Sequence, residues 1–168
     1  MSDTFKCVFF LIWTLVPVII FFTIYRSENK KIVNFLVRMA GYPKMRKFWC
    51  YILLLCLASF QILFFSLFPN ESGILLSTAL LIYFFSTKRT ENLLAKLSSE
   101  RNWFIGAVLA AIVTGFIPHL LPLSICIEFV VAFASCYPRQ GADDFWQNHY
   151  YSDKHVQQFV NYYFSFNS

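Results

Sequence analysis

One acidic side chain lies where an acid is costly, and it is the first candidate for chemistry. Glu128 sits within residues 103–136, an apolar stretch that contains no other Asp, Glu, Lys or Arg. A carboxylate at the centre of a bilayer costs several kcal/mol unless it is protonated or paired, about 2.5 to 3.5 kcal/mol on insertion scales for Asp. Glu128 therefore predicts either a proton or ion relay or a buried acid that fixes helix packing. Gln61 is the nearest polar partner by depth in the predicted bundle.

The other residue types that could catalyse or bind a metal form no recognisable pattern. Metal-ligand types occur near the C-terminus at Asp143, Asp144, His149, Asp153 and His155, but their spacing fits no zinc or calcium template. The five cysteines contain no C-x-x-C pair, and no glycine-rich loop could hold phosphates. The sequence predicts no catalytic, cofactor-binding or metal site, and no enzyme.

The composition indicates which elements must position Glu128. Hydrophobic residues make up 58% of the chain and charged residues 14%, against about 25% charged in soluble domains. The apolar residues come in long blocks, as they do in segments surrounded by lipid. Seven of the fourteen Lys and Arg lie in residues 26–47, directly after an apolar block. This position is typical of a topology signal and argues against a nucleic-acid partner.

The apolar blocks predict an all-α, polytopic membrane protein with about five transmembrane helices. The expected spans are residues 7–25, 48–68, 73–88, 103–117 and 120–136. Pro118 and Pro122 divide the last long block into two spans. The alternative is four spans and a re-entrant hairpin that returns without crossing. Residues 1–136 then form the transmembrane bundle and residues 137–168 an aromatic-rich tail.

The basic residues also predict the orientation. Eleven Lys and Arg lie in residues 26–47 and 88–101, which five spans place on one side of the membrane. The positive-inside rule makes that side the cytoplasm. The N-terminus is then outside and the C-terminal tail cytoplasmic, whereas a re-entrant last block would put the tail outside. The expected membrane is the bacterial inner membrane.

Two of the predicted spans carry small residues at helical spacing. Ala107, Ala111 and Gly115 recur every four residues in the fourth span, and Ser124 and Ala132 share a helical face with Glu128 in the fifth. Small residues allow transmembrane helices to approach closely. We expect these two stripes to pack together.

The two segments outside the spans have patterns of their own. In residues 26–47, apolar residues at helical spacing predict a short amphipathic helix, either lying on the membrane with Lys30, Lys31 and Arg38 directed to lipid phosphates or forming a solvated loop helix. A second amphipathic cytoplasmic connector is expected in residues 87–102. The tail is predicted to dock a partner or the membrane surface, or to fold back onto the bundle, through Phe145, Trp146, Tyr150, Tyr151, Phe159 and Tyr163.

Together these patterns predict a non-catalytic membrane protein that acts by binding another membrane complex. The leading hypothesis is an immunity or exclusion factor of a plasmid or phage, for example one that blocks conjugative or phage DNA entry. The abundance of Phe, Ile, Asn and Lys suggests an AT-rich, mobile gene. The alternatives are a small transporter or channel subunit using Glu128 and a membrane-protein assembly subunit. The lipid bilayer is the first expected partner and another membrane protein the second. Oligomerisation is compatible with all three functional hypotheses.

Overall fold

The computed structural model describes residues 3–24, 29–68, 73–117, 119–139, 141–148 and 155–165. The regular elements in these ranges are helices, so the predicted all-α fold is confirmed. They are α1 (Asp3–Ile24), α2 (Lys30–Gly41), α3 (Pro43–Leu67), α4 (Gly73–Phe84), α5 (Thr87–Ser99), α6 (Arg101–Phe116), α7 (Leu121–Ser135), α8 (Ala142–Asn148) and α9 (His155–Tyr163).

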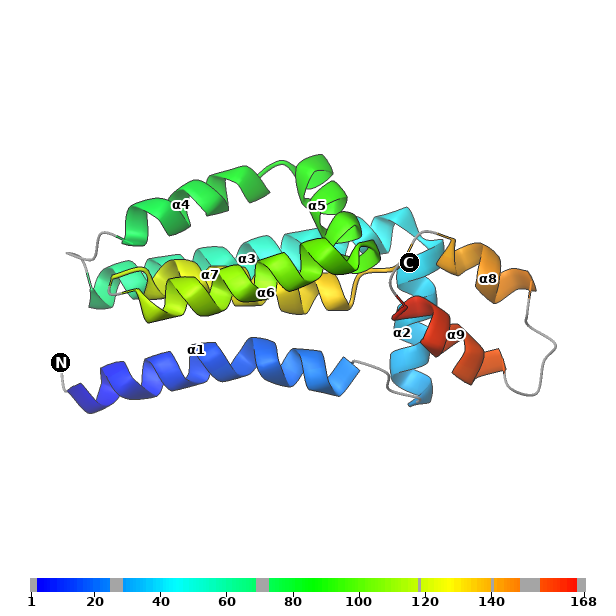
Figure 1. Cartoon of the computed structure of the whole chain (residues 1–168), viewed down its shortest axis with the longest axis horizontal. Helices are drawn as coiled ribbons and strands as arrows, with labels where there is room; N and C mark the ends of the chain where they lie inside the picture. The colour runs from blue at the N-terminus through cyan, green and yellow to red at the C-terminus, as the bar shows by residue number, and fades with distance from the viewer. Residues whose placement is uncertain are drawn as a thin grey trace.

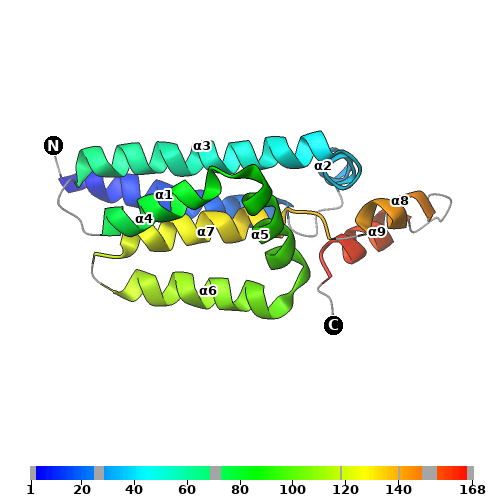
Figure 2. The same ribbon diagram turned by 90° about the horizontal axis from the view of Figure 1, so that it is seen from above.

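The apolar helices α1, α3, α4, α6 and α7 run along the long axis of the molecule (Figure 1). The remaining helices gather toward one end of this bundle, where α1 and α7 finish and where α3 and α6 begin (Figures 1 and 2). There α2, α8 and α9 lie beyond the bundle, while α5 crosses from the end of α4 to the start of α6. We call this group of four helices the cap.

Helix α7 is the centre of the bundle. It contacts α1, α3, α4, α5 and α6. A helix enclosed on so many sides must be apolar around its whole circumference, and it must be narrow where a neighbour comes close. Small residues supply the narrow positions, and Ile125, Phe129 and Phe133 fill the wider ones with side chains that are almost completely buried.

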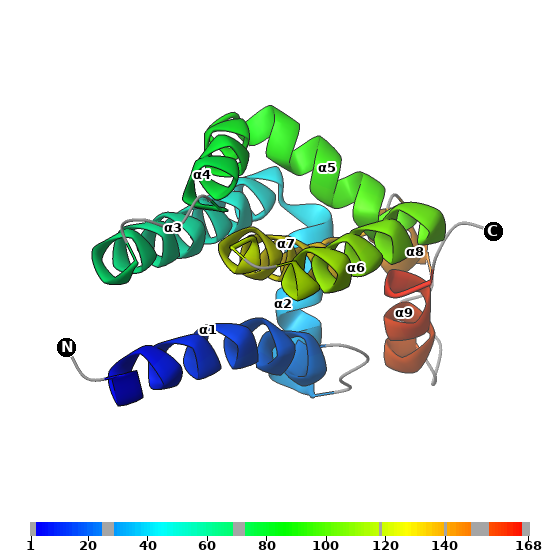
Figure 3. The same ribbon diagram turned by 60° about the vertical axis from the view of Figure 1, so that its left-hand side comes forward.

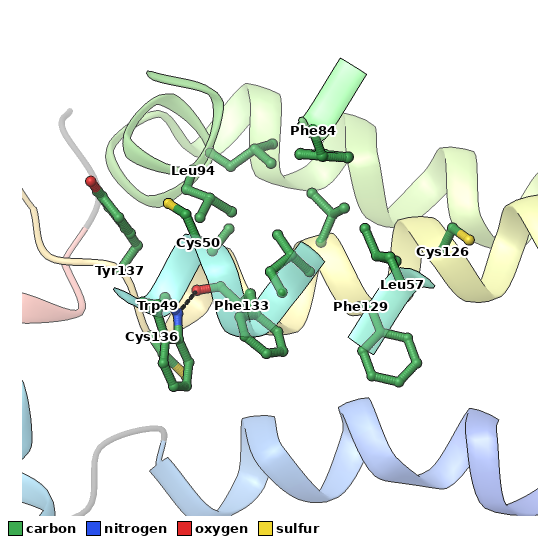
Figure 4. Packing of buried hydrophobic residues seen from close by; sticks show 14 of the residues in the cluster. Trp49, Cys50, Leu57, Phe84, Leu94, Cys126, Phe129, Phe133, Cys136 and Tyr137 are labelled. Atoms are coloured by element: carbon green, nitrogen blue, oxygen red, sulfur yellow. Dashed lines mark hydrogen bonds between the residues drawn. The ribbon is translucent and has the colours of Figure 1, made fainter. Parts of the chain in front are cut away.

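The core lies between α7 and α3, as Figure 4 shows. Trp49 of α3 packs against Phe133 with ring centroids 4.6 Å apart, and its indole N–H donates a hydrogen bond of 3.2 Å to the Phe133 carbonyl. Leu53, Leu57 and Phe60 continue the same face of α3 into the core. A buried Trp is stable only if its N–H finds an acceptor, so this bond fixes the register of α3 against α7.

The long apolar block of residues 103–136 is divided at the predicted place. Helix α6 ends at Phe116 and α7 begins at Leu121, with Pro122 in its first turn. His119, in the connection, has φ of 67°, a left-handed conformation that reverses the chain. The two helices then lie antiparallel along the bundle (Figure 2).

The range predicted as the third span, residues 73–88, contains a break. Helix α4 ends at Phe84, and α5 starts at Thr87 in a different direction (Figure 3). The Thr90 hydroxyl donates to the carbonyls of Phe84 and Ser86, both at 3.1 Å. The bond to Phe84 satisfies a carbonyl at the end of α4, and Ser86 is the N-cap residue of α5, so both bonds stabilise the break between the two helices. The predicted boundary was therefore too late.

Helix length varies widely within the bundle. Among the described residues, α3 is the one helix that is both long and apolar enough to cross a membrane. The segment Leu11–Ile24 of α1, together with α4, α6 and α7, is apolar but shorter than that criterion requires.

The start of α4 gives a test of this packing. A Cβ atom on Gly73 would lie 2.0 Å from the backbone oxygen of His119, whereas a Cβ on Gly106 of α6 meets nothing within 4 Å. Gly73→Ala must therefore displace the α6–α7 connection, at an expected cost of about 1 to 3 kcal/mol. Thermal unfolding should show a lower Tm for Gly73→Ala and no decrease for the control Gly106→Ala. Equal Tm values for both variants would contradict the packing.

Candidate functional site

Glu128 lies on the face of α7 that is turned toward α1 and α6. Its side chain is half-buried and lines a cavity of about 290 Å³ between these three helices. The other lining residues are apolar: Pro17, Val18, Phe21, Phe22, Val108, Ala111, Ile112, Val131 and Ala132. Val18, Phe22 and Ile112 are also exposed at the surface of the bundle. The carboxyl group is therefore directed into an apolar cavity that opens sideways between α1 and α6, which we call the Glu128 cavity.

The contacts of α1 explain why there is room beside Glu128. Trp13 packs against Phe60 of α3 and Phe129 of α7, with ring centroids 5.2 and 5.6 Å apart, and Pro17 is buried one turn later. Proline cannot donate a helical hydrogen bond, and its ring fills the space against the neighbouring helix. Trp13 and Pro17 thus attach α1 to the core, as do Val16, Ile20 and Ile24. On the side of α1 that faces the cavity, Val18, Phe21 and Phe22 form its wall.

No described residue gives the Glu128 carboxylate a hydrogen bond or an ion pair. The predicted partner, Gln61, does not line the cavity. Instead, the Gln61 amide donates to the Ile74 carbonyl at 3.2 Å and to Thr78 Oγ1 at 2.7 Å, and its oxygen accepts a bond of 2.9 Å from the Ser77 hydroxyl. Because α3 and α4 form a hairpin, hydroxyls on α4 reach Gln61 first. Gln61 therefore joins α3 to α4.

The small-residue stripes of α6 and α7 do meet. Ser124 donates a hydrogen bond of 2.7 Å to the Ala111 carbonyl, and a Cβ on Gly115 would lie 3.1 Å from Ser124 Oγ. Ala111 and Ala132 are buried, and Ala107 is half-buried. The same close approach brings Ala111, Ala132 and Glu128 to one cavity.

The aromatic residues of the tail pack within the cap. Phe145 stacks on Tyr162 at 4.4 Å, and Trp146 meets Phe159 edge-on at 4.9 Å. Phe159 and Tyr163 are buried with Val33, Leu36 and Ala40 of α2. Tyr150 and Tyr151 lie outside the described residues. Most of the described aromatic side chains of the tail thus pack against other residues of the chain, as the fold-back alternative expects. Docking of a partner by the tail stays a prediction.

One hydrogen bond attaches the tail to the bundle. The Tyr163 hydroxyl donates to the Cys136 carbonyl, just after α7, at 2.8 Å. Burial raises the pKa of Tyr163 well above its ordinary value, and the nearby Cys136 and Tyr137 act in the same direction, against a smaller opposing effect of Arg46. The phenol therefore keeps its proton and remains a donor.

The predicted lipid-facing basic residues lie on the outer face of the cap. Lys30, Lys31 and Arg38 are exposed on α2, whereas Val33, Leu36 and Met39 on the same helix are buried. Asn29 begins the helix by accepting a bond of 3.0 Å from the Lys31 backbone N–H. Helix α2 is amphipathic, as the spacing of its apolar residues predicted.

No protein-family model, no curated protein and no solved structure matches this chain. The description of the site therefore rests on its own geometry.

Sequence reasoning missed two features of this region. Trp13 was not singled out within the first predicted span, yet it packs α1 against the core. Ser77 and Thr78 were not singled out, although their polar side chains in an apolar block, opposite Gln61 across the predicted hairpin turn, were the available signal.

The hairpin network makes a prediction about stability. Gln61→Leu leaves the buried Ser77 hydroxyl without its amide acceptor and removes both amide donations to α4. Losing partners of buried polar groups should cost about 1 to 3 kcal/mol. The matched control is Ser66→Ala on the same helix, because the exposed Ser66 hydroxyl bonds only to a carbonyl of its own helix. A Tm for Gln61→Leu as high as that of Ser66→Ala would refute the network.

A second prediction concerns pH. Because folding raises the pKa of Tyr163, the folded chain holds this proton more tightly than the unfolded chain. The associated stability is complete below the ordinary tyrosine pKa of about 10 and is lost as the pH rises above it. Denaturation followed from about pH 9 to about pH 11 should show falling stability in the wild type and a smaller fall in Tyr163→Phe. The exposed Tyr42→Phe is the control, and an unchanged slope in Tyr163→Phe would exclude this residue as the cause.

Proposed function

We propose that this chain is a multi-pass membrane protein in which α1, α3, α4, α6 and α7 cross the bilayer. The support is the large apolar surface on the outside of these helices. Phe22, Leu75 and Phe116 are 74%, 76% and 86% exposed. Other exposed apolar side chains surround the bundle: Leu15, Ile19, Leu55, Ile62, Phe65, Ile82, Leu109 and Val113. So large an exposed apolar belt is unfavourable in water and is the surface that lipid chains require.

The lengths of the five helices fit a bilayer whose thickness adjusts locally to the protein. At about 1.5 Å per residue, the 25 residues of α3 and the 22 of α1 reach about 37 and 33 Å. The 16 residues of α6 and the 15 of α7 reach about 24 and 22 Å, and the 12 of α4 about 18 Å. Short spans are accommodated by local thinning of the bilayer, at a modest cost per Å.

The charges support one orientation. Basic residues gather at the cap end: Lys30, Lys31, Arg38, Lys44, Arg46, Lys47, Lys88, Arg89, Lys96, Arg101 and Arg139. The positive-inside rule assigns this end to the cytoplasm, most naturally of the bacterial inner membrane. The N-terminus is then outside, and the tail packed in the cap is cytoplasmic.

Within this framework the protein acts by binding another membrane protein at the Glu128 cavity. The observation that carries the proposal is a half-buried carboxyl group directed into an apolar cavity that is open between α1 and α6. An acid at this depth is stabilised when a neighbouring helix supplies a hydrogen-bond donor or a cation. Ala111 and Ala132 leave space for such a helix to come close. The partner is therefore a transmembrane helix that carries a polar or basic side chain.

The biological role that we propose is immunity or exclusion, in which the bound partner belongs to a complex for conjugative or phage DNA entry. A protein that acts by binding a transmembrane helix of its partner needs no catalytic group, and the sequence predicts none. A transporter or channel subunit is the second candidate, and Glu128 itself favours it. A conduction path needs several polar groups, however, and Glu128 is the single polar residue among the described residues that line the cavity.

Topology is tested by reporter fusions. Fusions after Lys47 and Arg101 should report the cytoplasm, because they place the reporter at the basic end, and a fusion at Asn70 should report the outside. Reporter activity normalised to protein abundance is the measurement. A cytoplasmic signal at Asn70 would contradict the arrangement.

Partner binding is tested by a photo-crosslinking amino acid at position 112 in cells. Ile112 lines the Glu128 cavity, while the neighbouring Val113 is exposed but does not line it, so position 113 is the matched control. We expect position 112 to crosslink a transmembrane segment with a polar or basic residue, identified by mass spectrometry, and position 113 not to do so. Glu128→Leu should reduce the adduct about tenfold or more at equal abundance, since it removes the one polar side chain among the described residues that line the cavity.

The same experiment separates the two candidate functions. An adduct that persists undiminished in Glu128→Leu would contradict recognition through the acid. If the purified protein in liposomes conducts ions or protons, and Glu128→Leu abolishes this flux, the result would contradict partner binding as the function and support the transporter function.

A further inference from the structure

A second apolar hollow lies between α4, α6 and α7, with α5 across its cap end. Its volume is about 570 Å³, and its lining residues include Tyr83 of α4, Leu93 of α5, Trp103, Ala107 and Ala110 of α6, and Val130 of α7. We call it the α4–α6 groove. It shares no lining residue with the Glu128 cavity, so the two hollows are separate.

The groove exists because two helices pack on α7 without filling the space between them. Helices α4 and α6 both contact α7, and α5 connects them at the cap end (Figure 3). Beyond Trp103, the α6 wall consists of Gly106, Ala107 and Ala110, whose small or absent side chains leave the space open. A Cβ on Gly106 would meet no atom within 4 Å.

The closure of the groove favours a thin occupant. Because α5 closes the groove at the cap end, a transmembrane helix, about 10 Å wide with its side chains, cannot lie along its full length. An acyl chain can, and the lining is apolar throughout, with the exception of the Tyr83 hydroxyl and the Trp103 N–H.

The cap end of the groove carries positive charge. Lys96 Nζ of α5 lies 3.9 Å from the centroid of the Trp103 ring, and the Arg89 guanidinium lies 6.0 Å from that of the Tyr83 ring. Tyr83 and Trp103 line the groove from opposite helices, so each brings a cation of α5 to its edge. Aromatic residues of this kind sit at the headgroup level of a membrane, where basic residues attract anionic lipids.

The acidic residue on the same helix does not cancel this charge. Glu91 faces the other side of α5, where it acts on Tyr137 and helps to raise the pKa of that phenol, although burial is the larger cause. Arg89 and Lys96 are exposed, and their charges face the groove edge and solvent.

We propose that the α4–α6 groove is a binding site for a phospholipid with an anionic headgroup. One acyl chain lies against Ala107, Ala110 and Val130, and the phosphate lies between Arg89 and Lys96 at the cap end. This inference rests on the membrane location and orientation in the proposed function, which make the lipid one of the cytoplasmic leaflet.

The test compares phosphatidylglycerol with phosphatidylcholine. The full-length protein is reconstituted in nanodiscs that contain equal amounts of the two lipids. The protein is then released from the nanodiscs in the mass spectrometer, and the lipids that remain bound to it are counted by native mass spectrometry. We expect the wild type to retain phosphatidylglycerol at least about fivefold over phosphatidylcholine. The double variant Arg89→Gln with Lys96→Gln should lose this preference, and the control Lys44→Gln, an exposed cation at the start of α3, should keep it.

A second set of variants tests the apolar part. Ala110→Trp should fill the groove and abolish retention of both lipids. Gly106→Leu, whose side chain enters open space in the groove, should do the same and keeps the test valid if Ala110→Trp impairs folding. Val113→Trp on the same helix lies outside the groove and should retain lipid.

The outcomes separate this inference from the proposed function. Equal retention of the two lipids by the wild type, an unchanged preference in the double variant, or full retention in both groove-filling variants would overturn the lipid site. Membrane extraction by carbonate is measured in parallel on the wild type. A protein that resists carbonate but binds no lipid refutes the inference alone, whereas a protein that carbonate releases refutes the membrane location.

Discussion

The structure depends on the enclosure of α7 by its neighbours. A helix in contact with five others can carry almost no polar group except where a specific partner accepts it. The Trp49 N–H at the Phe133 carbonyl and the Ser124 hydroxyl at the Ala111 carbonyl are such pairings, and they fix α3 and α6 on opposite parts of α7. The positions of α1, α4 and α5 follow from this centre, because each packs on what remains of the α7 surface.

Glu128 is the exception on this helix, and its exceptional position is what suggests a function. A structural acid would be expected to pair with a buried donor, as Gln61 pairs with Ser77 and Thr78 at the hairpin of α3 and α4. Instead, α1 is held by Trp13 and Pro17 in a way that leaves the carboxyl group facing an opening. In a bilayer, a hydrogen-bond donor or cation on a second helix would stabilise this unpaired carboxyl group, and for this reason we propose Glu128 as the recognition element.

The sequence predicted the helices better than their contacts. Hydropathy, the basic segments and the pair of prolines at residues 118 and 122 located the bundle helices and the α6–α7 division, because these are local properties of the chain. The end of α4 was misplaced because the bond that satisfies the Phe84 carbonyl comes from Thr90 in the following helix. The partner of Gln61 and the α4–α6 groove could not be predicted, since both depend on which face of a nearly uniform apolar helix turns inward. A sequence without polar contrast does not specify this.

The central claim is that the outer surface of the bundle is in contact with lipid, with Glu128 at the depth of the membrane. The most direct measurement is nitroxide scanning along α6 in liposomes, with collision rates for oxygen and for a water-soluble nickel complex. Leu109, Ile112 and Val113 are exposed on the outer part of α6, while Ala111 is buried against α7. The account predicts high oxygen and low nickel accessibility at the three exposed positions, low values for both at Ala111, and high nickel accessibility at Arg101. Nickel accessibility at Leu109 and Val113 as high as at Arg101 would show that water, not lipid, surrounds the bundle.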